Sequence, residues 1–255
     1  MSELTEPAFS LSYNSFISVK VQAYNLRGWS TLSVVNSNGA RVEVVPVKID
    51  LPMNGALTTE TQVDVYWNPL TTLDQMGGST CTIISYNLDW DKGTDGAEWE
   101  ELTGIYSLYA ASQFLQAVDV SSGNYYRFKV RAKNKYGWGE MSDDITILAA
   151  IQPDAPIGQS TQSLTSTLLS WTLPFEHGSS ISQYEILIRD KSGSYVEPPT
   201  CLGTDLQIVT ERQCFVPYVL LGQSTFNLEL GDPIVFQVRA KNVINWGDYS
   251  VDNTV

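Results

Sequence analysis

The chain has 255 residues and a formal net charge of −13, with 15 lysines and arginines against 28 acidic residues. This balance argues against nucleic-acid binding, because phosphate contacts require clustered Lys and Arg side chains. The sequence has no apolar run of about 18 residues, the length that predicts a membrane-spanning helix, and its first ten residues do not follow the pattern of a secretory signal peptide.

One pattern occurs three times along the chain, at Ile17–Ser33, Tyr125–Ser142 and Ile234–Ser250. In each copy, apolar and polar residues alternate, which predicts a strand with one buried and one exposed face. A turn containing Asn and Gly follows, because these residues accept left-handed backbone angles at low cost. A second strand then leads to the final Ser. Three copies of one hairpin predict a repeat protein.

The first copy belongs to a longer match, because residues 4–36 align without a gap on residues 221–253. The identical pairs include Phe9 and Phe226, Leu11 and Leu228, Ile17 and Ile234, Val21 and Val238, Ala23 and Ala240, Asn25 and Asn242, Trp29 and Trp246, and Ser33 and Ser250. The middle copy lies 108 residues before the last, as Phe128 and Phe236 show. The repeating unit is therefore predicted to be a pair of modules.

On this alignment, residues 1–45 supply only the last strands of a module whose first strands are missing. A lone hairpin is marginally stable in water, and it exposes unpaired strand edges. Two explanations stay open: the chain is a window on a longer protein, or another subunit completes the half domain.

The first whole module begins after Val42–Pro52, which is predicted to be a linker and entry strand. Two strands are predicted from the alternation of apolar residues, at Val63–Trp67 and Ile84–Trp90. The loop between them, Asn68–Cys81, is longer than its counterpart in the second module, and we place the insertion near Thr71–Met76.

The second whole module begins after Ile147–Pro156, a short linker rich in Pro and Ala. Few free residues at this junction predict a stiff connection between modules. The same strand pattern returns at Leu169–Trp171 and Tyr184–Ile188. The middle of this module differs from the first, because the cysteine-bearing segment Cys201–Cys214 replaces a tryptophan-bearing one.

The series Tyr-x-Phe-x-Val-x-Ala-x-Asn, followed by a Gly-containing loop and a Ser, resembles strands F and G of a fibronectin type III domain. The resemblance extends over nearly the whole chain. It implies an all-β fold of tandem fibronectin type III-like (immunoglobulin-like) β-sandwiches, two complete plus one C-terminal half domain. The expected boundaries are 1–45 for the half domain, 46–150 for the first complete domain and 151–255 for the second, which carries the predicted disulfide.

The same resemblance implies which aromatic residues form the sandwich cores. Trp67 takes the place of the buried strand-B tryptophan, and Tyr126 that of the corner tyrosine on strand F. Ile234 stands where the corner tyrosine of the last module would be. The expected structural core positions are Trp67, Tyr86, Tyr126, Phe128, Trp171, Tyr184 and Phe236.

Cys201 and Cys214 lie at opposite ends of a predicted hairpin, in a fold typical of extracellular proteins. We predict a disulfide between them, against the alternative of two unrelated buried thiols. Closing such a loop stabilises a protein by about 3 kcal/mol in the chain-entropy model. A zinc site is disfavoured because no nearby His or further Cys supplies ligands. Cys81 is expected to be a small buried residue.

A calcium loop is superficially suggested by Asp89, Asp91, Asp95 and Glu100. The match fails because Gly93-Thr94 occupies the positions where an oxygen ligand and a Gly are needed. No metal and no cofactor are therefore expected.

A tryptophan recurs between strands F and G in all three copies, at Trp29, Trp138 and Trp246. Rigid aromatic side chains of this kind can form a recognition surface, or each can pack over its own hairpin or against a neighbouring module. Because the residue repeats in every copy, we favour a role at the junctions between modules. The Arg-Gly-Asp sequence that this loop carries in some fibronectin-like modules is absent, so integrin binding is not implied.

Catalysis is not expected, because the chain shows no nucleophile, base and orienting group in a recognisable arrangement. The only histidine, His177, lies in a Gly/Ser-rich turn and is predicted to be solvated. The resemblance implies a non-catalytic structural or adhesive repeat segment of a large extracellular surface or fibre protein, similar to the long repetitive surface proteins of single-celled eukaryotes. Its expected partners are proteins, either neighbouring modules or copies of itself.

Two alternative functions remain at this point. One is a self-assembling filament subunit whose N-terminal half domain is completed by strands of a neighbouring subunit. The other is a ligand-binding receptor ectodomain, for which the insertion at Thr71–Met76 is the one hint.

Overall fold

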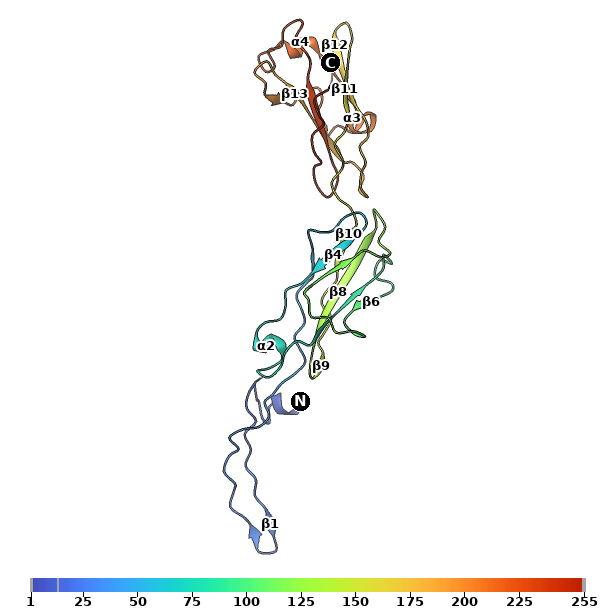
Figure 1. Ribbon diagram of the computed structural model, residues 1–255. Helices are drawn as coiled ribbons and strands as arrows, with labels where there is room; N and C mark the ends of the chain where they lie inside the picture. The colour runs from blue at the N-terminus through green and yellow to red at the C-terminus, as the bar shows by residue number, and fades with distance from the viewer. Residues whose placement is uncertain (1, 13, 254–255) are drawn as a thin grey trace. The chain divides into compact units, whose positions relative to one another are not determined.

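The computed structural model describes residues 2–12 and 14–253 (Figure 1). Contacts between residues divide the chain into two compact units. Unit 1 comprises Met1–Leu57, Asp64–Gln116 and Tyr125–Ile147, and unit 2 comprises Thr58–Val63, Ala117–Asn124 and Leu148–Val255. Each unit contains one β-sandwich.

The sandwich of unit 1 consists of two antiparallel sheets. One sheet has the order β3-β4-β7, and the other has the order β10-β8-β5-β6, with β9 paired to β8. Their bounds are β3 Met53–Asn54, β4 Val63–Tyr66, β5 Ser85–Trp90, β6 Glu100–Thr103, β7 Gln113–Gln116, β8 Tyr125–Asn134, β9 Gly137–Trp138 and β10 Ile145–Leu148. This arrangement is the A-B-E and C′-C-F-G topology of fibronectin type III-like domains.

The sandwich of unit 2 has the same arrangement, except that no regular strand G pairs with strand F among the described residues. Its sheets have the orders β11-β12-β15 and β14-β13-β16. Their bounds are β11 Gly158–Gln162, β12 Ser166–Trp171, β13 Gln183–Arg189, β14 Tyr195–Val196, β15 Gln213–Pro217 and β16 Phe236–Lys241, with the short helices α3 Leu206–Glu211 and α4 Tyr218–Leu221 beside them. The chain is therefore an all-β protein of tandem fibronectin type III-like sandwiches.

The alternation of the sequence produces both cores. Along β8, every second residue is buried, from Tyr126 to Asn134, and β13 and β16 alternate in the same way. Strand side chains point to opposite faces in turn, so one face of each sheet is apolar and packs on the other sheet. In unit 1 the ring centroids of Trp67 and Tyr86 lie 5.6 Å apart, and those of Trp90 and Tyr126 lie 5.5 Å apart in a stacked arrangement.

The first part of unit 1 is a hairpin with little regular ladder. It contains α1 Ser2–Thr5 and two short paired strands, β1 Tyr24–Asn25 and β2 Gly28–Trp29, at its tip (Figure 1). Helix α2 Leu73–Met76 lies later in unit 1, in the loop after β4. None of the helices in the described ranges is long and apolar enough to cross a membrane.

Candidate functional site

Each complete sandwich holds the linker that enters it by the same pair of backbone hydrogen bonds. In unit 1, Val44 N donates to Gly77 O at 2.9 Å and Val47 N donates to Gln75 O at 3.0 Å. In unit 2, the N–H of residue 151 donates to the carbonyl of residue 177 at 3.2 Å, and that of residue 154 donates to the carbonyl of residue 175 at 3.1 Å. We call these two arrangements the linker braces.

A buried asparagine at the end of strand F completes each brace. Asn134 Nδ2 donates to Val44 O at 2.6 Å and to Met76 O at 2.9 Å, and Asn242 Nδ2 donates to Ile151 O at 2.7 Å. Both asparagines are 1% exposed. A buried amide must satisfy its hydrogen bonds, so this side chain ties the linker, the loop after the second strand and the F–G turn together.

Two glycines allow the F–G hairpin to approach the linker. A Cβ on Gly139 would lie 2.4 Å from Pro46 O, and a Cβ on Gly247 would lie 2.1 Å from Pro153 O. Both distances are far below van der Waals contact, so a larger residue would push the linker away. The Gly that follows Trp138 and the Gly that follows Trp246 therefore have a packing role.

Unit 1 adds a buried carboxylate, Glu43, to its brace. The side chain is 4% exposed and accepts hydrogen bonds from Thr80 N at 2.8 Å, Lys135 Nζ at 2.8 Å and Tyr136 OH at 3.0 Å. Burial alone would raise the pKa of Glu43, but the hydrogen bonds from Lys135, Thr80 and Tyr136 outweigh it and lower the pKa to about 2. Glu43 is therefore held as a carboxylate.

Unit 2 has a histidine in its brace, His177, whose carbonyl takes the place of Gly77 O in unit 1. It lies in a turn as predicted, but the prediction that it is solvated was wrong. Its side chain is only 16% exposed, with Nδ1 2.8 Å from Glu60 Oε2 and Nε2 3.0 Å from Asp154 Oδ1. The hydrogen bond to Asp154 raises the pKa of His177, burial opposes this, and the hydrogen bond to Glu60 raises the pKa further. The sequence carried no signal for this cluster, because Glu60 lies 117 residues away.

The insertion near Thr71–Met76 folds as part of the unit 1 brace. Thr72 caps α2 in a capping box with Gln75, which explains why so short a segment is helical. The carbonyl groups of Gln75, Met76 and Gly77 are the ones that bind the linker and Asn134. In unit 2 the carbonyl groups of residues 175 and 177 make the same bonds from a loop without the insertion, so the brace does not depend on the extra residues.

The tryptophans of the two complete modules lie over cations of their own strand F. The Trp138 ring centroid is 5.0 Å from Arg131 Cζ and 5.2 Å from Lys133 Nζ, and the Trp246 ring is 4.7 Å from Arg239 Cζ. Both tryptophans are half-buried. Each such cation–π contact contributes about 0.5–1 kcal/mol at an exposed site. A role of these residues between modules or in recognition stays a prediction.

Trp29 is in a different setting. Its side chain is 66% exposed, and its neighbour in space is Tyr24, with ring centroids 4.9 Å apart. Tyr24 stands where Lys133 and Lys241 lie in the other copies. In the first hairpin the tryptophan therefore contacts an aromatic ring, Tyr24, whereas in the other two copies it contacts a lysine.

The residues expected in the cores occupy the interior of their own sandwiches. All seven are at most 5% exposed: Trp67, Tyr86, Tyr126, Phe128, Trp171, Tyr184 and Phe236. Ile234, at the position of the corner tyrosine in the last module, is 8% exposed.

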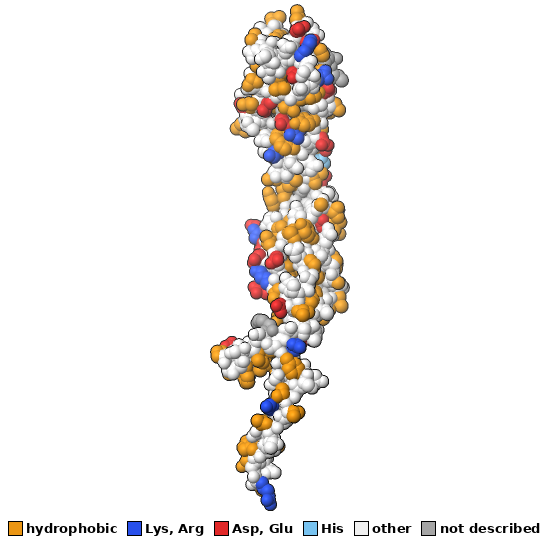
Figure 2. Space-filling model, turned by 90° about the vertical axis from the view of Figure 1, so that its left-hand side faces the viewer, with side chains coloured by type: hydrophobic (Ala, Val, Ile, Leu, Met, Phe, Trp, Pro, Cys, Tyr) orange, Lys and Arg blue, Asp and Glu red, His pale blue; other side chains and the backbone are white. Residues whose placement is uncertain are grey.

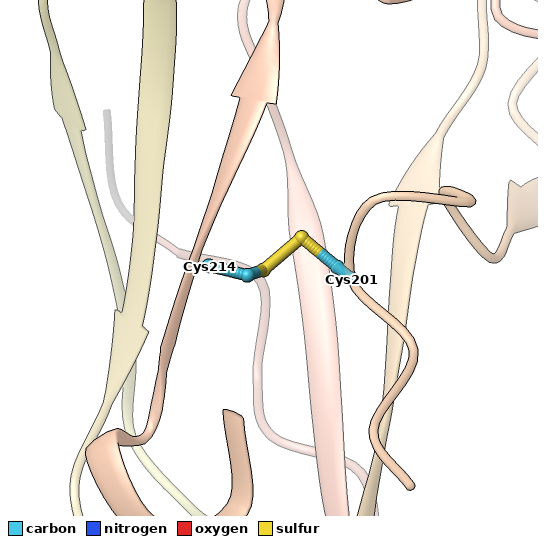
Figure 3. The surroundings of a disulfide bond; sticks show 2 residues. All are labelled: Cys201 and Cys214. Atoms are coloured by element: carbon cyan, nitrogen blue, oxygen red, sulfur yellow. A yellow bond between two sulfur atoms is a disulfide. The ribbon is translucent and has the colours of Figure 1, made fainter. Parts of the chain in front are cut away.

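The Cys201–Cys214 disulfide is present and links the two layers of unit 2 (Figure 3). Cys214 lies on β15, and Cys201 lies in the loop after β14. The expectation of a hairpin between the two cysteines was wrong, because helix α3 occupies that segment, capped by Asp205, whose Oδ1 accepts from Gln207 N at 2.8 Å. Cys81 is free and buried. Among the described residues, no group of three or more His, Cys, Asp or Glu side chains could hold a metal ion.

No family model matches the sequence. Among solved structures, the chain is similar to the FN1–FN3 domains of chicken CNTN1, with 16% sequence identity and a TM-score of 0.41. The match covers 92% of this chain and 76% of that chain.

Proposed function

We propose that this chain is a non-catalytic structural or adhesive repeat segment of a large extracellular surface or fibre protein. The two linker braces carry the proposal. A linker that is hydrogen-bonded to the module it enters has few free torsions, and a connection of this kind suits a protein that spaces its modules. The partners we propose are proteins, either neighbouring modules or further copies of the chain.

The extracellular assignment is supported by the Cys201–Cys214 disulfide, because such bonds persist mainly in oxidising compartments. The receptor alternative has less support. The loop Asn68–Cys81 that carries the insertion has a structural use, because the carbonyl groups of Gln75 and Gly77 hold the linker. Origin in a single-celled eukaryote rests on the sequence resemblance alone.

The braced-spacer proposal is tested by replacing Asn134 or Asn242 with Ala and following hydrogen exchange of the amides of Val44 and Ile151. We expect exchange at least about tenfold faster, since the loss of a buried hydrogen bond costs about 1–3 kcal/mol. Asn25→Ala is the matched control, because Asn25 is the exposed copy of these residues. Unchanged exchange at both linkers would remove the support for a stiff spacer.

The location is tested on the native protein by antibody labelling of intact cells and by counting thiols with a maleimide after denaturation without reductant. We expect surface labelling and, among the three cysteines of residues 1–255, a maleimide on Cys81 alone, because Cys201 and Cys214 are bonded to each other. Labelling that requires permeabilised cells, together with three reactive thiols, would contradict an extracellular location.

A further inference from the structure

Residues 4–36, hereafter the N-terminal hairpin, share local hydrogen bonds with residues 221–253, their copy in unit 2. Three hydrogen bonds recur at matching positions. They are Phe9 N to Glu6 O at 3.0 Å, Ser10 N to Glu6 O at 2.8 Å and Leu11 N to Leu4 O at 3.0 Å, against Phe226 N to Gln223 O at 3.0 Å, Asn227 N to Gln223 O at 2.6 Å and Leu228 N to Leu221 O at 2.9 Å. The left-handed backbone also recurs, with φ 48° at Ser10 and 56° at Asn227.

The two segments also join strands F and G through the same side chains. Ser33 Oγ accepts from Val21 N at 3.0 Å, and Ser250 Oγ accepts from Val238 N at 3.0 Å. Asn36 and Asn253 each accept a further strand-F amide at 2.7 Å through Oδ1. The N-terminal hairpin therefore already has the shape of the F–G half of a fibronectin type III-like module.

Burial separates the core positions of the two segments. Phe9, Val19 and Val21 are 62%, 51% and 67% exposed, whereas the aligned residues of the copy are 0% exposed. In the copy, these side chains lie in the core cluster that includes residues of β12, β13 and β15. Figure 2 shows hydrophobic side chains along the exposed N-terminal hairpin. Since their copies gather in one core, these exposed apolar side chains mark an interaction surface.

We propose that the face formed by Phe9, Val19 and Val21 docks against the front half of an incomplete module. This occupant is a polypeptide segment with the strand pattern of residues 156–221 that lacks its own F–G hairpin. The inference rests on the proposed repeat function and names the partner of one segment. The internal copy shows what covers such a face.

A second copy of this chain does not fit as the occupant. Its strands β12, β13 and β15 are already covered by its own Phe226, Phe236 and Val238, which are fully buried. Exchange of one hairpin for the other would leave the same amount of strand surface uncovered. A front half without its own F–G hairpin buries additional apolar surface when it binds the N-terminal hairpin, and a front half that already has one does not.

Two residue differences specify the occupant further. In unit 2, a Cβ added to Gly158 would lie only 2.8 Å from Cζ of Phe236. The N-terminal hairpin has the smaller Val19 in place of Phe236. The occupant therefore has room for a side chain at the position of Gly158. Ser30 stands where Gly139 and Gly247 lie, so the entry linker of the occupant must lie farther from the hairpin than Pro46 or Pro153 does.

The test is a fusion in which a copy of Pro156–Leu220 is placed directly before Leu4 of the full chain, as Leu220 precedes Leu221. Hydrogen exchange of the amides of Val19 and Val21 is compared with that of the unfused chain. We expect exchange slowed at least about 100-fold and an additional cooperative unfolding transition, because the hairpin becomes part of a closed core. The matched control carries Leu169→Asp in the added copy only and should leave both amides unprotected.

A reference fusion keeps the result decisive if the chimeric module fails to fold. In it, residues 221–253 replace residues 4–36 after the added copy, which restores a complete natural module. If the reference fusion protects its amides and the fusion with the N-terminal hairpin does not, the proposal is overturned. It is also overturned if the unfused chain protects Val19 and Val21 as its concentration rises, because the occupant is then a second copy.

Substitution at Gly158 gives an independent measurement. Made in unit 2, Gly158→Ala should be destabilising, because Phe236 blocks the new Cβ. Made at the same position of the added copy, it should leave the added module as stable as before or more stable. Equal destabilisation at both places would show that the hairpin does not pack as its copy does. Either result leaves the proposed extracellular function untouched, since that function is tested by location and thiol count.

Discussion

The N-terminal hairpin and its copy in unit 2 carry nearly the same pattern and the same local hydrogen bonds, yet one is exposed and the other is buried. Ser33 and Ser250 hold their strands at the same distance, so the hairpin geometry does not depend on a core. The 0% exposure of Phe226, against 62% for Phe9, does depend on one. The local sequence determines the geometry of the hairpin. Packing on an opposing sheet determines how much the hairpin contributes to the free energy of unfolding.

The largest expected effect that separates the two segments comes from their matched phenylalanines. Phe226→Ala should lower the free energy of unfolding of unit 2 by about 3–5 kcal/mol, because it removes a fully buried ring and leaves a cavity. Phe9→Ala should change the stability of unit 1 by less than about 0.5 kcal/mol, since its ring already contacts water. Urea unfolding followed by tryptophan fluorescence measures both. Equal losses would show that the hairpin is buried in solution.

The disulfide provides the next largest effect, and only unit 2 has one. Replacing Cys201 and Cys214 together with Ala should cost unit 2 about 3 kcal/mol, the value expected for a loop of about 15 residues. The exchange of the N-terminal hairpin amides should not change. Cys81→Ala is the control for a buried cysteine outside the bridge. A shift in the unfolding of unit 1 in the double variant would contradict the prediction that the disulfide stabilises unit 2 alone.

The serines that bridge strands F and G test the same comparison at a single hydrogen bond. Ser250→Ala should cost about 1–2 kcal/mol, because the amide of Val238 is buried and loses its acceptor. Ser33→Ala should have little effect, as water can replace the hydroxyl at the exposed amide of Val21. Hydrogen exchange of the two amides distinguishes the cases. A large loss at Ser33 would indicate a covered strand.

The last comparison uses pH, to which the two braces should respond in opposite directions. The pKa of Glu43 is lowered to about 2 in the folded state, so its contribution is present above the unfolded value of about 4.5 and is lost as the pH falls toward 2. The pKa of His177 is raised. Its contribution is therefore complete below the unfolded value of about 6.5 and is lost as the pH rises through the folded pKa.

This contrast is measured by thermal unfolding between pH 2 and 9 with Glu43→Gln and His177→Gln. Glu43→Gln should remove the acid-dependent loss in unit 1, and His177→Gln should remove the loss toward alkaline pH in unit 2. The same slope in wild type and variant would show that the group in question does not couple to folding.

Much of the fold could be predicted from the alternation of residues in single strands. The strands around Phe128 and Phe236, the strand ending at Trp171 and the match between residues 4–36 and 221–253 all depend on patterns within short stretches. The pairing of Cys201 with Cys214 needed only two nearby cysteines. Helix α3 between them was missed because its cap, Asp205, is a weak local signal beside a strong expectation of strands.

The sequence alone determined the F–G hairpins and the buried face of each strand, because period-2 alternation decides which face of a strand is dry. The resemblance to fibronectin type III domains supplied the topology and the aromatic core positions. Only the tertiary structure decided what the polar residues do. Asn134 looked like a turn residue and proved to hold a linker 90 residues away, and His177 looked solvated and proved to lie between Glu60 and Asp154. Such contacts join segments that are distant in sequence, so they are set by how the elements pack and not by any local pattern.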